Sequence, residues 1–194
     1  MRVQFIAACM AAALTFPMSA SAVTTAGPGG FDNGYATAIT FDPSAARGTS
    51  NNRADPLNAL GSPDGDFFEI GTGSTIDLTF GTLFDTSATI FEVTFGSASR
   101  FPESAKVEVG LGGTFESVGS ITNVAAQGGG VLTIAGLTNN VFDTLRIIDT
   151  SSQRPGGFDV DAVRVSPVPI PAAALFLLTA LGGFGLIRRL GARG

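Results

Sequence analysis

Apolar and polar residues alternate with a period of two along much of the middle of this chain. In residues 75–80 the alternation is unbroken, and similar short runs follow it at fairly regular spacing. The runs cover residues 75–80, 90–95, 106–109, 115–118, 131–134, 144–148 and 158–165. Because successive side chains of a β-strand point to opposite faces of the sheet, each run predicts a strand.

Turn-forming residues separate these runs. Glycine, asparagine or proline stands at residues 81–82, 96–97, 112–113, 128–130, 139–140 and 155–157. About seven short strands, rich in β-branched and aromatic residues, predict an all-β fold, an antiparallel jelly-roll-like β-sandwich. Residues 38–41 add a candidate edge strand, and the absence of a helical period in this region disfavours an α/β fold.

The N-terminal residues 1–22 have a different character. Arg2 precedes a mostly apolar stretch, which ends in the small residues 19–22. This order predicts a signal peptide that is removed on export, with a buried N-terminal helix as the alternative. Its removal takes away Cys9, the only cysteine. The predicted ectodomain, residues 23–166, then has no disulfide and depends on its hydrophobic core.

Residues 167–194 change character again. A proline-rich segment is followed by an uncharged apolar run, and Arg188 and Arg189 come directly after it. The uncharged run of about 18 residues would span roughly 27 Å as a helix, just enough for a bilayer core. The pattern predicts a transmembrane helix over about 172–187 with a basic cytoplasmic tail. The alternative is a buried C-terminal helix of the domain.

The proline-rich segment, the apolar run and the two arginines together resemble the VPLPA-CTERM sorting signal, a variant of the PEP-CTERM family of Gram-negative bacteria. The resemblance implies recognition by an exosortase-like membrane transpeptidase. It also implies an inner-membrane-anchored precursor and a mature form at the cell surface or outside the cell. The motif residues are Val168, Pro169, Ile170, Pro171, Ala172, Arg188 and Arg189, with isoleucine where the motif has leucine.

A second resemblance covers residues 59–165. The segments 59–65, 90–93, 103–109, 145–151 and 157–163 are similar, in order and spacing, to a discoidin-like, galactose-binding-type jelly roll. The chain departs from that pattern because it has no tryptophan and carries residues 110–113 in place of the usual hairpin turn. Jelly rolls of this type often hold a structural calcium ion between an early loop and the last strand.

Charge and missing residue types exclude several functions. All 16 acidic residues but only seven of the 11 basic residues lie between the terminal segments, a net charge of −9. Such a domain should repel nucleic acid and tolerate divalent cations. The chain has no histidine, which excludes Ser-His and Cys-His catalysis and histidine-ligated zinc. Glycoside hydrolysis needs two paired carboxyl groups, and the sequence alone does not pair Glu92, Glu103, Glu108 or Asp149.

Calcium binding is a better explanation for the acidic residues than glycoside hydrolysis, because hard cations prefer carboxylate and carbonyl oxygens. The candidate ligands are Asp64, Asp66, Asp159 and Asp161; the alternative is local turn hydrogen bonding by the first two and a solvated pair formed by the last two. The period of two would direct Asp159 and Asp161 outward or toward a loop.

The sequence predicts a non-enzymatic exported surface or extracellular-matrix protein. The alternative is a carbohydrate-binding module that attaches cells to polysaccharide.

Overall fold

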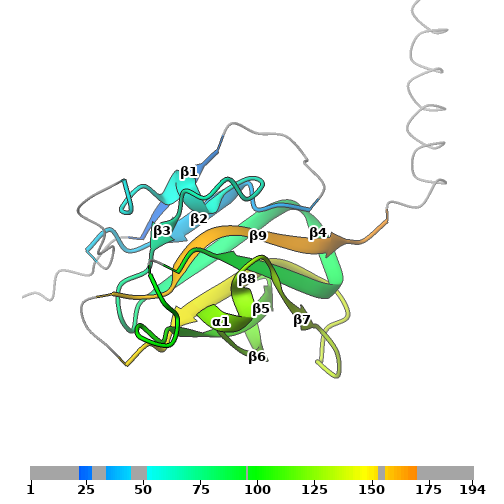
Figure 1. The fold of residues 1–194 in the computed structure, drawn as a ribbon. Coiled ribbons are helices and arrows are strands. Elements are labelled where there is room, and N and C mark those ends of the chain that lie inside the picture. The colour runs from blue at the N-terminus through cyan, green and yellow to red at the C-terminus, as the bar shows by residue number, and fades with distance from the viewer. Residues whose placement is uncertain (1–21, 28–33, 45–51, 95, 153–155, 170–194) are drawn as a thin grey trace, which may run out of the picture.

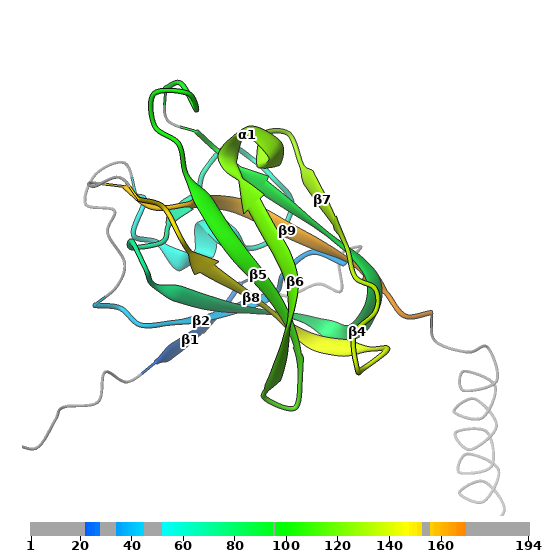
Figure 2. The same cartoon turned by 90° about the horizontal axis from the view of Figure 1, so that it is seen from below.

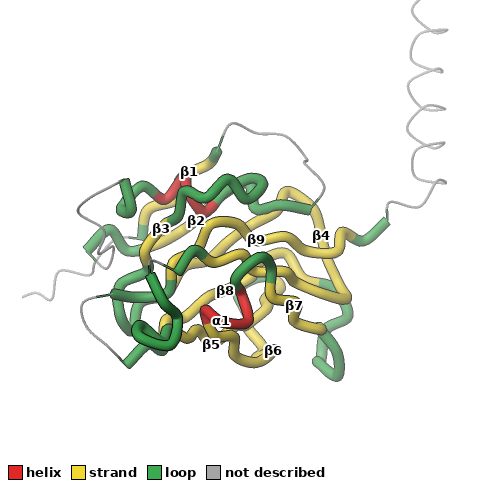
Figure 3. The backbone as a smooth tube through the Cα atoms, viewed as in Figure 1, coloured by secondary structure: helices red, strands yellow, loops and turns green. Residues whose placement is uncertain are grey.

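The structure is a computed structural model that describes residues 22–27, 34–44, 52–94, 96–152 and 156–169. Most of these residues lie in strands, with two single-turn helices between them (Figure 3). Nearly all of the predicted signal peptide, and the predicted transmembrane run with its basic tail, lie outside the described residues. In the part of the chain that is described, no helix is long and apolar enough to cross a membrane.

The elements follow one another in the order of their labels in Figure 1. They are β1 (Val23–Ala26), β2 (Ala38–Phe41), the 3₁₀ helix η1 (Pro56–Ala59), β3 (Phe68–Glu69), β4 (Thr75–Glu92), β5 (Ser104–Leu111), β6 (Thr114–Thr122), α1 (Asn123–Ala126), β7 (Gly130–Thr133), β8 (Phe142–Asp149) and β9 (Asp159–Pro167). Strands therefore form at each predicted run, and at the predicted edge segment 38–41. The short strands β1 and β3 were not predicted.

Strand β4 is 18 residues long and belongs to both layers of the fold. Its first part pairs with β2 and β8, and its last part pairs with β7 and β9. The pairing with β8 shifts register between Thr79 and Phe84, and Gly81 has a φ of 66° there. The predicted turn at residues 81–82 is therefore wrong. A glycine-containing irregularity bends the strand without reversing it, because glycine tolerates the positive φ.

The bend divides the sheet into two antiparallel layers (Figures 1 and 2). One layer has the strand order β1-β2-β4-β8-β5-β6, and in the other β9 lies between β3 and the end of β4, which also pairs with β7. Every strand pairing is antiparallel. The predicted class, an antiparallel jelly-roll-like β-sandwich, is confirmed.

The core lies between the layers and is built from alternating positions of the strands. Ile76 and Leu78 of β4 are buried in one layer, and Ile90, later in the same strand, is buried in the other. Phenylalanines fill the bend: Phe84 packs edge-on against Phe80 with ring centroids 5.2 Å apart. Burial of each such side chain contributes about 1.5–3 kcal/mol, so these residues stabilise the packing of the two layers.

Candidate functional site

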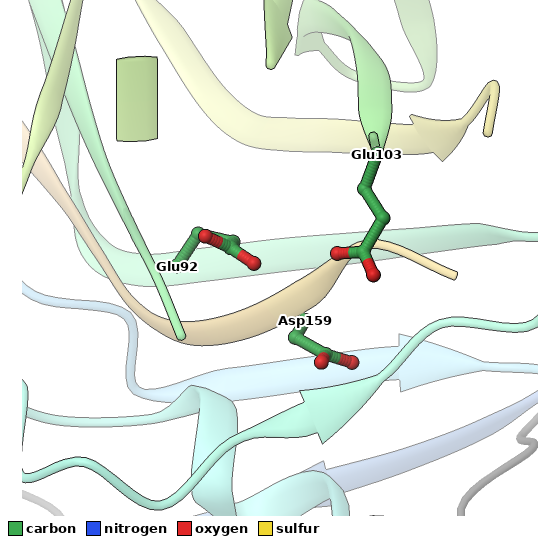
Figure 4. Close-up of side chains that lie close together, drawn as sticks. All are labelled: Glu92, Glu103 and Asp159. Atoms are coloured by element: carbon green, nitrogen blue, oxygen red, sulfur yellow. The ribbon is translucent and has the colours of Figure 1, made fainter. Parts of the chain in front are cut away.

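Three acidic side chains meet where three strands begin or end. Glu92 is the last residue of β4, Asp159 is the first residue of β9, and Glu103 directly precedes β5. One carboxylate oxygen from each lies within 4.8 Å of the other two. Figure 4 shows the three side chains close together, extending from three different segments of the chain. We refer to Glu92, Glu103 and Asp159 as the carboxylate cluster.

Local contacts hold two members of the cluster in place. Asn123, buried at the start of α1, donates its backbone N–H to the Glu103 carbonyl at 3.1 Å. Its side-chain amide donates to the Phe101 carbonyl at 2.8 Å, so one residue fixes the chain before β5. On the other side, a Cβ on Gly157 would lie 1.6 Å from the Ile70 carbonyl oxygen. Only glycine fits there, two residues before Asp159.

The cluster is buried, and burial changes its acidity. Asp159 and Glu92 are each 4% exposed. Burial raises the pKa of Asp159 to about 9, with a further contribution from the negative charges of Glu103, Glu69 and Glu92. Burial also raises the pKa of Glu92 and Glu103, and the Glu92 charge raises the pKa of Glu103 further. Holding three ionised carboxylates together therefore costs free energy, because burial removes their hydration and their negative charges repel one another.

The cluster has few hydrogen-bond donors around it. Thr94 donates its hydroxyl to Glu92 Oε2 at 2.8 Å. Glu92 Oε1, Glu103 Oε2 and Asp159 Oδ1 are buried without a hydrogen-bond donor among the residues that the structure describes. Glu92 and Glu103 face each other closely enough to share a proton. Since buried carboxylate oxygens need a donor or a cation, these residues could hold either protons or a metal ion.

The acids considered for glycoside hydrolysis separate into two groups. Glu92 and Glu103 meet in the cluster. Glu108 instead forms an ion pair with Lys106 on β5, at 2.7 Å. Asp149 is buried as the acceptor of several hydrogen bonds, among them one from the Phe158 backbone N–H at 2.9 Å.

The four aspartates predicted to bind calcium also lie in two places. Asp161 accepts hydrogen bonds from the backbone N–H groups of Asp64 at 3.1 Å and Gly65 at 3.3 Å. The Asp66 N–H donates to Asp64 Oδ1 at 3.0 Å, which is the turn hydrogen bond that the sequence left as the alternative. Asp159 lies in the carboxylate cluster instead. Calcium binding by this set of four stays a prediction.

A β-bulge explains why alternation did not place these residues. Opposite β4, Phe91 pairs with Ala162 and Glu92 pairs with Val160, so Asp161 is an extra residue on β9. A bulge redirects the side chains around it. Asp159 and Asp161 are both buried, so neither faces outward, but Asp161 does face the loop that contains Asp64 and Gly65, which was the other expected direction.

Sequence reasoning considered Glu92 and Glu103 as catalytic acids and missed them as metal ligands. A signal for Glu92 was present, because it has the same parity along β4 as the buried Ala88 and Ile90. An acid on the core face of a strand is unusual, and it points to a charged or protonated interior site. Glu103 gave no such signal, because it lies in a connection with no regular period.

The sorting motif lies mostly outside the described residues. Val168 donates its N–H to the Leu83 carbonyl at 2.9 Å, just after β9 ends, and Pro169 is exposed. Ile170, Pro171, Ala172, Arg188 and Arg189 are not described.

A second feature is an open concavity of about 560 Å³ beside the bend in β4. Most of its lining residues have polar side chains, and three of its threonines come from strands of one layer. The lining residues are Thr37, Thr79, Gly81, Thr82, Leu83, Asp143 and Thr144. Hydroxyl and carboxylate groups of this kind can both donate and accept hydrogen bonds to a polar ligand.

No protein-family model matches this sequence, and no curated protein matches it either. Among solved structures, the chain is similar to a GH29 fucosidase from Ruminococcus gnavus in complex with fucose, with 17% identity and a TM-score of 0.47. That alignment covers 68% of this chain and 25% of the fucosidase, so the chain spans about a quarter of that protein.

Two smaller modules are also similar to this chain. One is chitosan-binding module 1 of a chitosanase/glucanase from Paenibacillus sp. IK-5, with 16% identity, a TM-score of 0.46, and coverage of 69% of this chain and 94% of the module. The other is a GH31 CBM32-2 module bound to GalNAc, with 13% identity, a TM-score of 0.41, and coverage of 76% and 99%.

Proposed function

We propose that the β-sandwich is a non-catalytic carbohydrate-binding module carried by an exported surface protein. The observation that supports this most directly is the concavity beside the bend in β4. It is open to solvent, as a site for a polysaccharide chain can be, and its lining is rich in hydroxyl groups.

The chemistry of the concavity suits a sugar. Thr79, Thr82 and Thr144 contribute hydroxyl groups, and Asp143 contributes a carboxylate. The Asp143 side chain is fixed by the Gly112 N–H at 3.1 Å and the Thr144 hydroxyl at 2.7 Å, which orders one wall before any ligand binds. Leu83 is 43% exposed and gives the site an apolar surface against which a pyranose ring can pack.

Burial argues against catalysis by the carboxylate cluster. A glycosidase places its two carboxyl groups on either side of the scissile bond, with the sugar between them. Glu92 and Asp159 are each 4% exposed, so a sugar ring cannot reach them without opening the fold. The carboxylate cluster is therefore poorly placed for glycoside hydrolysis, and the proposed sugar site is the concavity.

Delivery to the cell surface is the second part of the proposal. The signal-peptide pattern at residues 1–22 and the three-part tail at residues 167–194 support export, membrane anchoring and processing by an exosortase-like transpeptidase. Polysaccharide at the cell surface is then the partner that the concavity would meet. A surface or matrix protein without a sugar ligand is the alternative.

Binding can be tested with the full-length chain in a sedimentation assay against insoluble and gel-forming polysaccharides. We expect retention by at least one polysaccharide, and at least a tenfold loss of retention in Leu83→Arg. Leu57→Arg is the matched control, because Leu57 is 41% exposed and lies in η1, away from the concavity. If no polysaccharide retains the wild-type chain, the carbohydrate-binding proposal is wrong.

Anchoring can be tested separately by cell fractionation. The double substitution Arg188→Glu with Arg189→Glu removes the positive charges that would orient the apolar run, so we expect mislocalisation and loss of processing. Normal membrane retention and processing of this variant would count against the sorting signal.

A further inference from the structure

We propose that Glu92, Glu103 and Asp159 bind a single calcium ion that joins the ends of β4, β5 and β9. This site differs from the set of aspartates that the sequence predicts, since it shares only Asp159 with that set. It is also separate from the concavity of the proposed function.

The geometry fits one ion. Calcium binds carboxylate oxygens at about 2.3–2.6 Å, so two oxygens on the same ion are at most about 5 Å apart. The three carboxylates each present an oxygen within 4.8 Å of the others, and Figure 4 shows the three side chains close together. Only small side-chain movements are needed for all three to contact one ion.

The burial of unpartnered oxygens is an independent indication of a ligand. Glu92 Oε1 and Asp159 Oδ1 belong to side chains that are 96% buried, and no donor in the described chain reaches either atom. A buried polar atom without a partner costs about 1–3 kcal/mol, and more if it is charged. A fold that places two such atoms beside a third carboxylate is more easily understood if a cation belongs there.

The charge around the site favours a divalent ion. The cluster contributes three negative charges when it is ionised. The next acid, Glu69, lies beside a cation, since Arg53 Nη1 is 3.6 Å from Glu69 Oε2. Asp149 is not available, because its carboxylate oxygens already accept several hydrogen bonds. A calcium ion would thus neutralise two of the three cluster charges.

The type of ligand selects among metals. The chain has no histidine, and its one cysteine, Cys9, lies in the predicted signal peptide. An all-oxygen set of carboxylates suits calcium or magnesium and is poor for zinc or copper. Calcium tolerates irregular coordination, whereas magnesium demands a near-octahedral arrangement and retains its water. The buried and irregular meeting of three strand ends therefore favours calcium.

The ion would fasten the connection between β4 and β5 to the start of β9. The described parts of that connection are residues 93–94 and 96–103, and its end before β5 is held by Asn123. Glu103 is its last residue. The calcium ion would act as a second fastening, and its removal should loosen this end of the sandwich before the rest.

The test measures calcium content and thermal unfolding of the full-length chain after EDTA treatment. We expect one calcium per chain after reloading. At a calcium concentration about 100 times the dissociation constant, the midpoint should rise by roughly 5–10 °C. An unchanged midpoint with no bound calcium would overturn the proposal and leave protons on the three carboxyl groups. A shift of equal size with magnesium would overturn the assignment to calcium.

Substitutions locate the ion and keep the test independent of misfolding. Asp159→Asn and Glu103→Gln should each abolish the calcium-induced shift while raising the midpoint in EDTA. Without calcium, each buried carboxyl group must either take up a proton on folding or keep an uncompensated charge, and a neutral amide needs neither. Asp161→Asn is the matched control, with the same change on the same strand, and should keep the shift. Loss of the shift in Asp161→Asn, with retention in Asp159→Asn, would place the ion at the loop and overturn the proposal.

Discussion

Two buried acids near the start of β9 differ in the hydrogen-bond donors around them. Asp149 is 2% exposed and accepts hydrogen bonds from the Gly73, Ser151 and Phe158 backbone N–H groups and the Ser151 hydroxyl. Asp159 is 4% exposed and follows Phe158 directly, yet its Oδ1 has no donor in the described chain. The two residues are similarly buried, but only Asp149 accepts hydrogen bonds at both carboxylate oxygens, whereas the positive charge of Arg53 only partly offsets the effect of burial on the pKa of Asp159.

This difference in hydrogen bonding distinguishes Asp149, an acid with a structural role, from Asp159, a candidate metal ligand. An anion that accepts several N–H bonds is compensated within the fold, and it joins the turns that supply those bonds. An anion that faces other carboxylates is compensated only by a proton or a cation. Burial by itself therefore does not identify a metal site, whereas burial together with a shortage of donors does.

The largest loss of stability should come from removing Asp149, whose charge is compensated by hydrogen bonds. Asp149→Ala leaves four donors in three turns without their acceptor, so we expect a loss of about 3–5 kcal/mol in the free energy of unfolding. Urea unfolding with calcium present measures it. Asp143→Ala, at a half-buried position near the start of the same strand, is the control and should cost about 1 kcal/mol or less. Equal losses for the two variants would contradict the comparison.

A smaller effect is expected from loosening the support of the cluster. Asn123→Ala removes the side-chain hydrogen bond to the Phe101 carbonyl, so the segment before Glu103 should become less well placed. We expect a loss of about 1–2 kcal/mol and weaker calcium binding, without abolition of it. Calcium titration of the unfolding midpoint measures both. Val124→Ala is the control, since Val124 is 66% exposed. An unchanged calcium affinity in Asn123→Ala would show that this residue does not position Glu103.

The smallest effect should come from the exposed loop. Asp64→Ala removes one turn hydrogen bond, the one donated by the Asp66 N–H, and leaves the acceptor Asp161 in place. We expect a change of less than about 1 kcal/mol in the free energy of unfolding, with the calcium-induced shift intact. Thermal unfolding with and without EDTA measures this. If the shift disappears, the calcium ligands lie in the loop.

Much of the fold could be predicted from local pattern. The strict alternation in residues 75–80 and the glycines and asparagines between runs indicate strands without any tertiary information. The continuation of β4 through Gly81 could not be predicted, because a glycine at a turn and a glycine at a bend in one strand have the same local signature. The two-residue strand β3 forms only because β9 pairs with it.

The candidate site was predicted less completely. Asp159 was singled out, and Glu92 and Glu103 were considered only as possible catalytic acids. Their meeting depends on Glu92 ending β4 opposite Val160 and on Glu103 entering from a different connection. The bulge at Asp161 removed that residue from the cluster, and no pattern of period two reveals a bulge in advance.

The sequence by itself determined the all-β class, the position of most strands, the acidic balance and the exclusion of histidine and disulfide chemistry. These follow from composition and from short-range periodicity, which act between neighbours in the chain. Tertiary structure decided which acids are compensated and which are not. Donors for Asp149 come from residues 73, 151 and 158, and the partners of Asp159 come from residues 92 and 103. Such pairings depend on strand register and on where each strand ends, and the packing of the core sets both.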